Sequence, residues 1–297
     1  MSRYRPALLS LLLILSATRF TRSSTLLLCG GAQVTEDEVT SFQGKPALKE
    51  IWHWRPEESE GLPIPFMRKF ITTDDCKGVS HGSEILITSS GDAVALVSHA
   101  TGKTLFYASA KNAHSAELLP GGLIAVASSS DSDGEGDRIM LFDRHRSEKP
   151  LVTLPLTAAH GVVWDNKRNI LWALGGKELV RIRVDLAVAS SPRMIAEKSV
   201  LLPAQEGHDL QLSDDCSTLY VTNTKTVFRV DPDLMSFTPY DPFHGIGQIK
   251  SLSINPDTRQ IAFTRADPGV WWTYTLRFLN PDQQIVLPAM IYKVRWF

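Results

Sequence analysis

Three histidines and a lysine stand at matching places along the chain. His114, His160, His208 and Lys250 are separated by 46, 48 and 42 residues, and each lies four residues before the last apolar residue of a short alternating run. Imidazole has an unperturbed pKa of about 6.5, so it can accept or donate a proton near neutral pH, and an ammonium group attracts a carboxylate. If the fold brings the four side chains together, they predict a site for an anionic ligand in which the three histidines are catalytic.

The segments around these residues indicate which elements must position them. Each segment has a short alternating strand, a turn rich in Pro, Gly, Asp or Asn, and a second strand, and a third run ending near Asp often follows. A period of forty-odd residues with four strands per unit is typical of a β-propeller blade. The four aligned segments are AHSAELLPGGLIAVASS, AHGVVWDNKRNILWALGG, GHDLQLSDDCSTLYVTN and IKSLSINPDTRQIAFTR.

We therefore predict an all-β, WD40-like fold in which residues 25–297 form a single β-propeller domain of four-stranded blades. Six blades account for the repeats, with seven as the alternative. The C-terminal IYKVRWF looks like a first strand without a partner, and the N-terminal TLLLCGG can complete that blade. Pairing of the two ends would close the ring and remove exposed strand edges. The first strand of each blade would then line a central channel and gather the histidines at its mouth.

The N-terminal residues 1–24 predict a secretory signal peptide. In MSRYRPALLSLLLILSATRF, two arginines precede an apolar run that is too short to span a bilayer. We expect a secreted, extracellular protein that is not associated with the membrane after cleavage. Three cysteines allow one disulfide and leave one thiol over. The formal net charge of -1 gives no positive field for nucleic-acid binding, and we expect a monomer.

Two stretches resemble known propeller families. The stretch LSDDCSTLYVTNTKTVFRVD, residues 212–231, resembles the repeat of the YVTN family through its turn, its literal YVTN and a third strand ending in Asp. The wider pattern, especially NAHSAELLPGGLIAVASS and DDCKGVSHGSEILITSSGD, resembles a group of secreted propellers, the L-rhamnose-α-1,4-D-glucuronate lyases. This second resemblance implies an enzyme that removes rhamnose from glucuronate on plant arabinogalactan by β-elimination. The implied partner is an acidic oligo- or polysaccharide.

Elimination at a uronate needs a neutralised carboxylate, a base for the C5 proton and an acid for the departing oxygen. We predict that His114 or His160 is the base and that Lys250 and Arg295 bind the carboxylate. Lys77, near the start of another inner strand, is a further candidate for substrate binding.

Metal binding is a different use of the same residues. Three neutral imidazoles can bind a divalent metal, with Gln248 as a fourth ligand or, without metal, as a substrate-binding residue. A nearby ammonium disfavours a cation. A calcium site in the loop from Asp131 to Asp137 is also disfavoured, because Phe142 stands where the bidentate acid is expected. We therefore predict no cofactor.

The sequence is also compatible with a glycoside hydrolase and with a non-catalytic carbohydrate- or protein-binding propeller. Hydrolysis would need paired carboxylates, for which Asp75, Asp209 and Glu117 are candidates. Exposed aromatic rings would favour sugar binding, but we expect Trp271 and Trp272 to pack between blades. Formation of unsaturated uronates would distinguish a lyase from a hydrolase.

Overall fold

The computed structural model describes residues 25–42, 45–130, 132–146, 149–185 and 192–297. The predicted signal peptide, residues 1–24, lies outside the described residues. Within the described part of the chain, no helix is long and apolar enough to cross a membrane.

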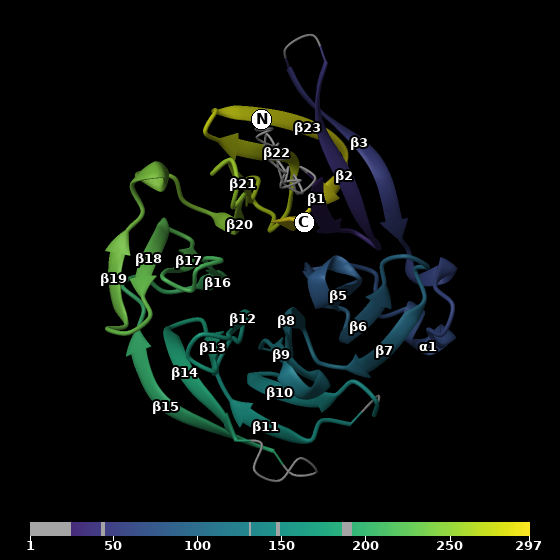
Figure 1. The fold of residues 1–297 in the computed structure, drawn as a ribbon, viewed down its shortest axis with the longest axis vertical. Coiled ribbons are helices and arrows are strands. Elements are labelled where there is room, and N and C mark those ends of the chain that lie inside the picture. Colours follow the sequence, from purple (N-terminus) through teal and green to yellow (C-terminus); the bar gives the residue numbers. More distant parts are fainter. Residues whose placement is uncertain (1–24, 43–44, 131, 147–148, 186–191) are drawn as a thin grey trace, which may run out of the picture.

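Six antiparallel sheets of four strands surround a central axis in the described residues (Figure 1). Blade 1 contains β4 (Asp75–Val79), β5 (Glu84–Ser89), β6 (Ala93–Ser98) and β7 (Thr104–Ser109), and blade 2 contains β8 (Ala113–Leu119), β9 (Leu123–Ser128), β10 (Arg138–Asp143) and β11 (Val152–Pro155). Blade 3 contains β12 (Gly161–Asp165), β13 (Ile170–Leu174), β14 (Glu178–Asp185) and β15 (Arg193–Leu201), and blade 4 contains β16 (Gly207–Leu212), β17 (Leu219–Asn223), β18 (Val227–Asp231) and β19 (Ser236–Pro239). Blade 5 contains β20 (Ile249–Ile254), β21 (Ile261–Arg265), β22 (Thr273–Leu279) and β23 (Gln283–Ile291), and the closing blade contains β24 (Lys293–Trp296), β1 (Thr25–Gly30), β2 (Gln33–Phe42) and β3 (Lys45–Trp54).

This arrangement confirms the all-β propeller and the count of six blades. The first strand named in each blade is its inner strand, and each inner strand lies against those of the two neighbouring blades. Helices are short connectors: η1 (Pro56–Glu58), α1 (Ile64–Met67), η2 (Ser80–Gly82), η3 (Pro120–Gly122) and η4 (Asp241–Phe243).

The closing blade joins the two ends of the described chain, as the sequence predicts. β24 pairs antiparallel with β1, so that Leu26 is opposite Trp296 and Leu28 is opposite Val294. The Thr25 hydroxyl also donates a hydrogen bond to the backbone carbonyl oxygen of Phe297 at 3.2 Å. The closing blade thereby lies between blades 5 and 1, and the inner strands form a continuous ring.

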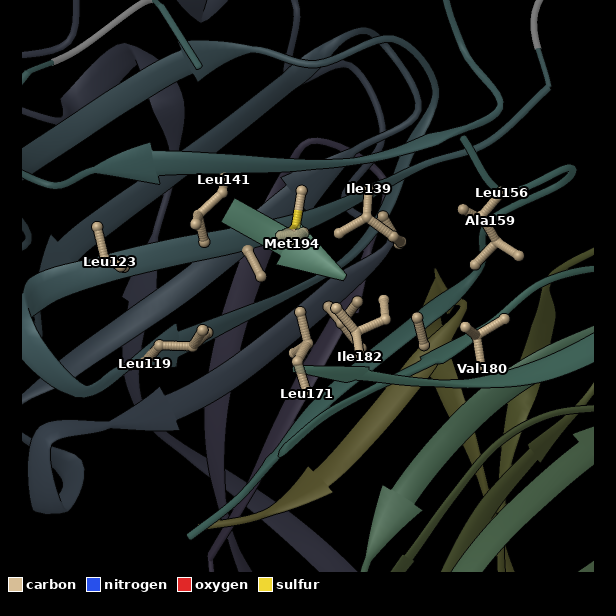
Figure 2. Close-up of a cluster of buried hydrophobic side chains, with 14 residues drawn as sticks. Leu119, Leu123, Ile139, Leu141, Leu156, Ala159, Leu171, Val180, Ile182 and Met194 are labelled. Carbon is tan, nitrogen blue, oxygen red and sulfur yellow. The ribbon is translucent and has the colours of Figure 1, made fainter. Parts of the chain in front are cut away.

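The core consists of apolar side chains that fill the spaces between adjacent blades. Because neighbouring residues of a strand point to opposite faces, each alternating run supplies one row of side chains to the blade on either side. Between blades 2 and 3, Leu141 packs in one cluster with Leu171 and Ile182, all of them fully buried (Figure 2). This packing fixes the rotation of each blade and hence the position of the inner strand that it presents to the channel.

All three cysteines are free thiols and are buried. Cys29 lies on β1 and Cys76 on β4, whereas Cys216 lies in the turn after β16. Burial and the neighbouring Cys29 thiol raise the pKa of Cys76 well above its usual value. Cys76 therefore stays protonated and is a poor nucleophile.

Candidate active site

β-Bulges set the direction of the side chains that the repeat singles out. The register between the first and second strands shifts at His114 in β8, at His208 in β16 and at Lys250 in β20. A bulge leaves one extra residue outside the ladder and changes the direction of its side chain. His160 directly precedes β12, and its N–H donates to the Leu174 carbonyl oxygen at 2.8 Å. All four residues thus lie where their inner strands begin.

The four loops that lead to these residues share a positive φ at one position. The residue two positions earlier has a positive φ in each blade: 43° at Asn112, 49° at Ala158, 63° at Glu206 and 62° at Gln248. Residues other than glycine seldom adopt this conformation. Its recurrence shows that the four loops share this turn of the backbone although their residue types differ.

The three imidazole rings lie side by side. The ring centroids of His114 and His160 are 4.3 Å apart with their planes inclined by 12°, and those of His160 and His208 are 5.7 Å apart at 69°. Side chains from three consecutive blades therefore form one contiguous cluster. The fold does bring together residues that are more than forty positions apart in the sequence.

His160 is held as a neutral imidazole. Its Nδ1 lies 2.9 Å from the Ala158 carbonyl oxygen, which can only accept, so Nδ1 carries the proton and Nε2 has the free lone pair. Burial, followed by the neighbouring His114 and His208, holds the pKa of His160 well below its usual range. His160 is therefore a weak base.

Lys250 and His208 form a hydrogen-bonded pair. The Lys250 ammonium donates to His208 Nε2 at 2.8 Å, so the imidazole proton is on Nδ1. Burial lowers the pKa of Lys250 to about 8, against an opposing effect of Glu206. Burial, followed by the charge of Lys250, lowers the pKa of His208 to about 3. At neutral pH the pair is an ammonium beside a neutral imidazole.

Two imidazole nitrogens in this cluster have unused hydrogen-bonding capacity. Nδ1 of His114 and Nδ1 of His208 are both buried and have no hydrogen-bond partner among the residues that the structure describes. The His208 atom is a donor, since Nε2 of that ring accepts from Lys250. An unpaired buried donor is unfavourable, so it favours a ligand that presents an acceptor oxygen.

Asp74 occupies the equivalent position in blade 1, and the sequence analysis did not identify it. Its Oδ1 lies 3.4 Å from His114 Nδ1, whereas its Oδ2 accepts hydrogen bonds from the Ser90 N–H and the Thr72 hydroxyl. The separation is longer than a good hydrogen bond, but such contacts often shorten when substrate binds. Asp74 is therefore placed to orient the His114 ring.

Tyr292 occupies the equivalent position in the closing blade and was also missed. Its ring centroid lies 6.1 Å from that of His114. Burial, followed by the negative charge of Asp74, raises the pKa of Tyr292 well above its usual value, so the phenol stays protonated. The six residues at this position form the mouth cluster: Asp74, His114, His160, His208, Lys250 and Tyr292.

A buried ionic layer lies next to the mouth cluster, further along the inner strands. The Arg295 guanidinium donates to both oxygens of Asp209 at 2.8 and 2.7 Å and lies 2.8 Å from Asp75. Lys293 Nζ lies 3.3 Å from Asp209 and 3.8 Å from Asp75. At most 4% of any of these four residues is exposed. Arg295 is thus committed to the channel interior, and the prediction that it binds a substrate carboxylate beside Lys250 is not supported by its position.

The same layer accounts for two of the three carboxylates considered for hydrolysis. Burial alone would raise the pKa of Asp75, but the charges of Arg295 and Lys293 hold it below its usual value. The pKa of Asp209 is likewise lowered, because the same two cations outweigh the effect of burial. Both groups are ionised and paired within the protein. They are not placed as the acid and base of a glycoside hydrolase.

Lys77 lies at the opposite end of the channel from the histidines. Its ammonium donates to the Val162 carbonyl oxygen at 2.6 Å and to the Glu117 carboxylate at 3.3 Å. Lys77, Glu117 and Arg295 line a hollow of about 610 Å³ where the inner strands end. The structure therefore separates Lys77 from the mouth cluster, whereas the sequence analysis placed both in one site.

Comparison of the sequence with protein families adds an assignment. Residues 40–297 match the profile of a family of unknown function (DUF6528). The chain belongs to this family. A search of the curated proteins finds no match. The description of this family names no activity.

The mouth cluster of this DUF6528 propeller is not arranged as a metal site. Within the described ranges, no group of three or more His, Cys, Asp or Glu side chains is placed to hold a metal ion. His208 Nε2 already accepts a hydrogen bond from Lys250, and the rings of His114 and His160 are stacked. Gln248, proposed as a fourth ligand, is exposed and lines a separate hollow. These donors do not converge on one point.

The acidic loop of this DUF6528 chain shows a similar mismatch with calcium. Asp131 lies outside the described residues. Lys111 Nζ is 2.8 Å from Asp133, and Asp137 accepts a hydrogen bond from the Ala158 N–H at 2.6 Å. An ammonium and a backbone donor therefore use carboxylate oxygens that a calcium ion would need.

The neutral imidazoles predict a pH-dependent stability. An unfolded histidine binds a proton near pH 6.5, whereas His208 does so only near pH 3 when folded. The contribution of these neutral histidines to the free energy of unfolding is therefore fully present above about pH 6.5 and is lost as the pH is lowered. For each such histidine, the free energy of unfolding falls by about 1.4 kcal/mol per pH unit. We expect H160Q/H208Q to flatten the dependence between about pH 5 and 6.5, measured by urea unfolding. The control H244Q, at an exposed histidine, should leave the pH dependence unchanged. If H160Q/H208Q and wild type have the same slope of unfolding free energy against pH, the two histidines are not the source of the pH dependence.

Proposed function

We propose that this protein is a secreted, uronate-directed polysaccharide lyase that cleaves by β-elimination at the mouth cluster. The observation that supports this best is the Lys250–His208 pair, which combines an ammonium with an unpaired imidazole N–H. His208 contacts His160, and His114 stacks on the other side of His160. The resemblance to rhamnose–glucuronate lyases agrees with this chemistry and names an acidic plant arabinogalactan as substrate. Secretion is proposed from the apolar N-terminal residues.

The uronate carboxylate binds to the Lys250 ammonium, which His208 holds in place. An ammonium group has three N–H donors, and Lys250 uses one of them on His208. The remaining two donors bind the carboxylate oxygens. His208 Nδ1–H points away from Lys250 on the other side of the ring and can donate to a different oxygen of the sugar. Because Lys250 is only 6% exposed, the attraction is stronger than it would be in water. Neutralising the carboxylate makes the C5 proton of the sugar more acidic.

His114 is the base and Tyr292 the acid. His114 has the Asp74 carboxylate beside its Nδ1, which leaves Nε2 to accept the C5 proton. As the C5–H bond breaks, the C4=C5 double bond forms and the C4–O bond breaks. The departing oxygen takes a proton from the Tyr292 phenol, and the proton on His114 then returns to the tyrosinate through solvent. His160 supports the stack but is too weak a base for this step.

Product analysis tests the proposal. Wild-type protein would be incubated with a panel of acidic polysaccharides, with and without chelator, and with the same polymers after reduction of their carboxyl groups. The proposal predicts products that absorb in the ultraviolet as unsaturated uronates, only from unreduced polymers and irrespective of chelator. Cleavage without unsaturation would show a hydrolase, and binding without cleavage would show a non-catalytic binding propeller. Either result would overturn the lyase.

The Lys250 ammonium predicts an alkaline limit to activity. As the pH rises through about 8, Lys250 loses its charge, and kcat/KM for an acidic substrate should fall. Replacement of Lys250 with arginine, which stays charged, should move this limit upward even if the rate at neutral pH drops. The pH–rate profiles of the two proteins provide the measurement. An alkaline limit at the same pH in K250R would contradict the assignment to Lys250.

A further inference from the structure

A second hollow, of about 560 Å³, lies next to the strand that carries Lys250. It is formed by the connection from β21 to β22 and by Gln248, two residues before Lys250. Arg265 is paired with Ile249 across β20 and β21, and the Ala266 N–H donates to the Gln248 carbonyl oxygen at 3.0 Å. The hollow is therefore at the same end of the propeller as the mouth cluster.

Two arginines line this hollow without a carboxylate partner. Neither Arg265 nor Arg277 forms an ion pair with any residue that the structure describes, and Arg277 donates only to the Thr275 carbonyl oxygen, at 3.2 Å. The nearby Asp267 carboxylate instead accepts hydrogen bonds from the Thr273 hydroxyl and the Tyr274 N–H. Asp267 still attracts Arg277 through its charge, so the two arginines and one aspartate leave the hollow with a net excess of one positive charge.

An exposed indole lies in the same hollow. Trp271 is 71% exposed, so the expectation that it packs between blades is wrong for this residue. Large aromatic side chains are usually buried to a much greater extent, and an exposed ring presents a flat apolar face. Beside two guanidinium groups, that face fits a ligand that has both an anionic group and an apolar ring surface.

We infer that this hollow is a second carbohydrate subsite, which binds an acidic sugar residue of the same polymer that the mouth cluster binds. Arg265 and Arg277 bind its carboxylate, because the planar fork of a guanidinium matches two carboxylate oxygens. Trp271 stacks on the face of its sugar ring. The identity of the ligand as a sugar acid rests on the proposed function, whereas the anionic and apolar character of the ligand rests on the hollow itself.

Binding to a glucuronate-bearing arabinogalactan tests the subsite without turnover. All proteins would carry H114A, and affinity electrophoresis would compare the acidic polymer with its carboxyl-reduced form. W271A should weaken binding of the acidic polymer about tenfold, and R265A/R277A should weaken it by a similar factor. The carboxylate-dependent binding that remains is expected from Lys250 in the mouth cluster, which is unchanged in these variants. R229A, an exposed arginine on β18 at the other end of the channel, is the control and should change binding less than about twofold. Trp271 is exposed enough that its replacement leaves folding intact.

The outcomes separate the subsite from the proposed activity. If W271A and R265A/R277A bind the acidic polymer as R229A does, the subsite is overturned, even where wild-type protein releases unsaturated uronates. If these variants bind the acidic polymer more weakly while wild-type protein releases no unsaturated product, the subsite stands and the lyase is overturned.

Discussion

Replacement of His114 with alanine should lower the rate of uronate elimination by about 10²- to 10⁴-fold, the usual contribution of a positioned general base. His114 is the imidazole that combines contact with a carboxylate, 3.4 Å from Asp74, with a place in the ring stack. The remaining imidazoles cannot replace it, because the pKa values of His160 and His208 are held too low. The rate of formation of unsaturated uronates from a glucuronate-bearing arabinogalactan provides the measurement.

Two further variants test whether the lower rate of H114A is due to the missing general base. D74N should lower the rate less than H114A and change its pH dependence, because Asp74 orients the ring rather than contacting the sugar. H244A alters an exposed histidine outside the mouth cluster and should be as active as wild type. A fully active H114A protein with an intact fold would exclude His114 as the base.

Replacement of Arg295 with methionine should lower the free energy of unfolding by about 3–5 kcal/mol, because it leaves buried carboxylates without their main partner. Arg295 contacts both Asp75 and Asp209, which come from blades 1 and 4 and are each 1% exposed. Lys293 alone cannot satisfy both, since its Nζ lies 3.3 Å from one and 3.8 Å from the other. Urea unfolding at neutral pH would measure the loss.

Matched substitutions calibrate this loss. R229A removes the same charge from an exposed position and should change stability by less than about 0.5 kcal/mol. R295K keeps the charge but not the bidentate geometry, so its stability should fall between those of R295M and wild type. If R295M is as stable as wild type, the ionic layer does not hold the inner strands together.

The fold was accessible from the sequence because a propeller repeats one pattern of alternation and turns. Anchoring each segment on the last apolar residue before its turn, such as Leu118 or Leu212, placed His114 and His208 in the same register. The structure shows why this register matters for direction as well as position. Both residues are bulged out of the ladder, and no propensity argument would have revealed those bulges.

Two members of the mouth cluster were missed because their blades offer weaker anchors. In blade 1, the residue four positions after Asp74 is Gly78, which is not a large apolar residue. Stepping back four residues from an apolar anchor therefore does not lead to Asp74. In the closing blade, Trp296 was available as an anchor for Tyr292, but no turn follows it before the chain ends. Lys77 and Arg295, the cations of these two inner strands, are the residues that the sequence predicts there instead.

Arg295 could not be assigned correctly from sequence, because its position depends on pairing across the channel. Its partners Asp75 and Asp209 are 220 and 86 residues away in the sequence, in blades that are not adjacent to each other. Strand periodicity gives the face of a side chain but not its depth along the channel. Only the assembled ring shows that Arg295 lies in the ionic layer rather than at the mouth.

The central claim is that residues from all six blades form one anion-binding site at the mouth cluster. Its most direct test is an NMR titration of histidine-labelled protein with methyl β-D-glucuronide, with methyl β-D-glucoside as a control that lacks only the carboxylate. We expect the imidazole signals of His114, His160 and His208 to shift with one midpoint, those of the exposed His81 and His244 to stay fixed, and the glucoside to have no effect. Fixed signals for all three mouth histidines at saturating glucuronide would contradict the account. A shift confined to His81, which follows the strand that carries Lys77, would place the ligand at the opposite end of the channel.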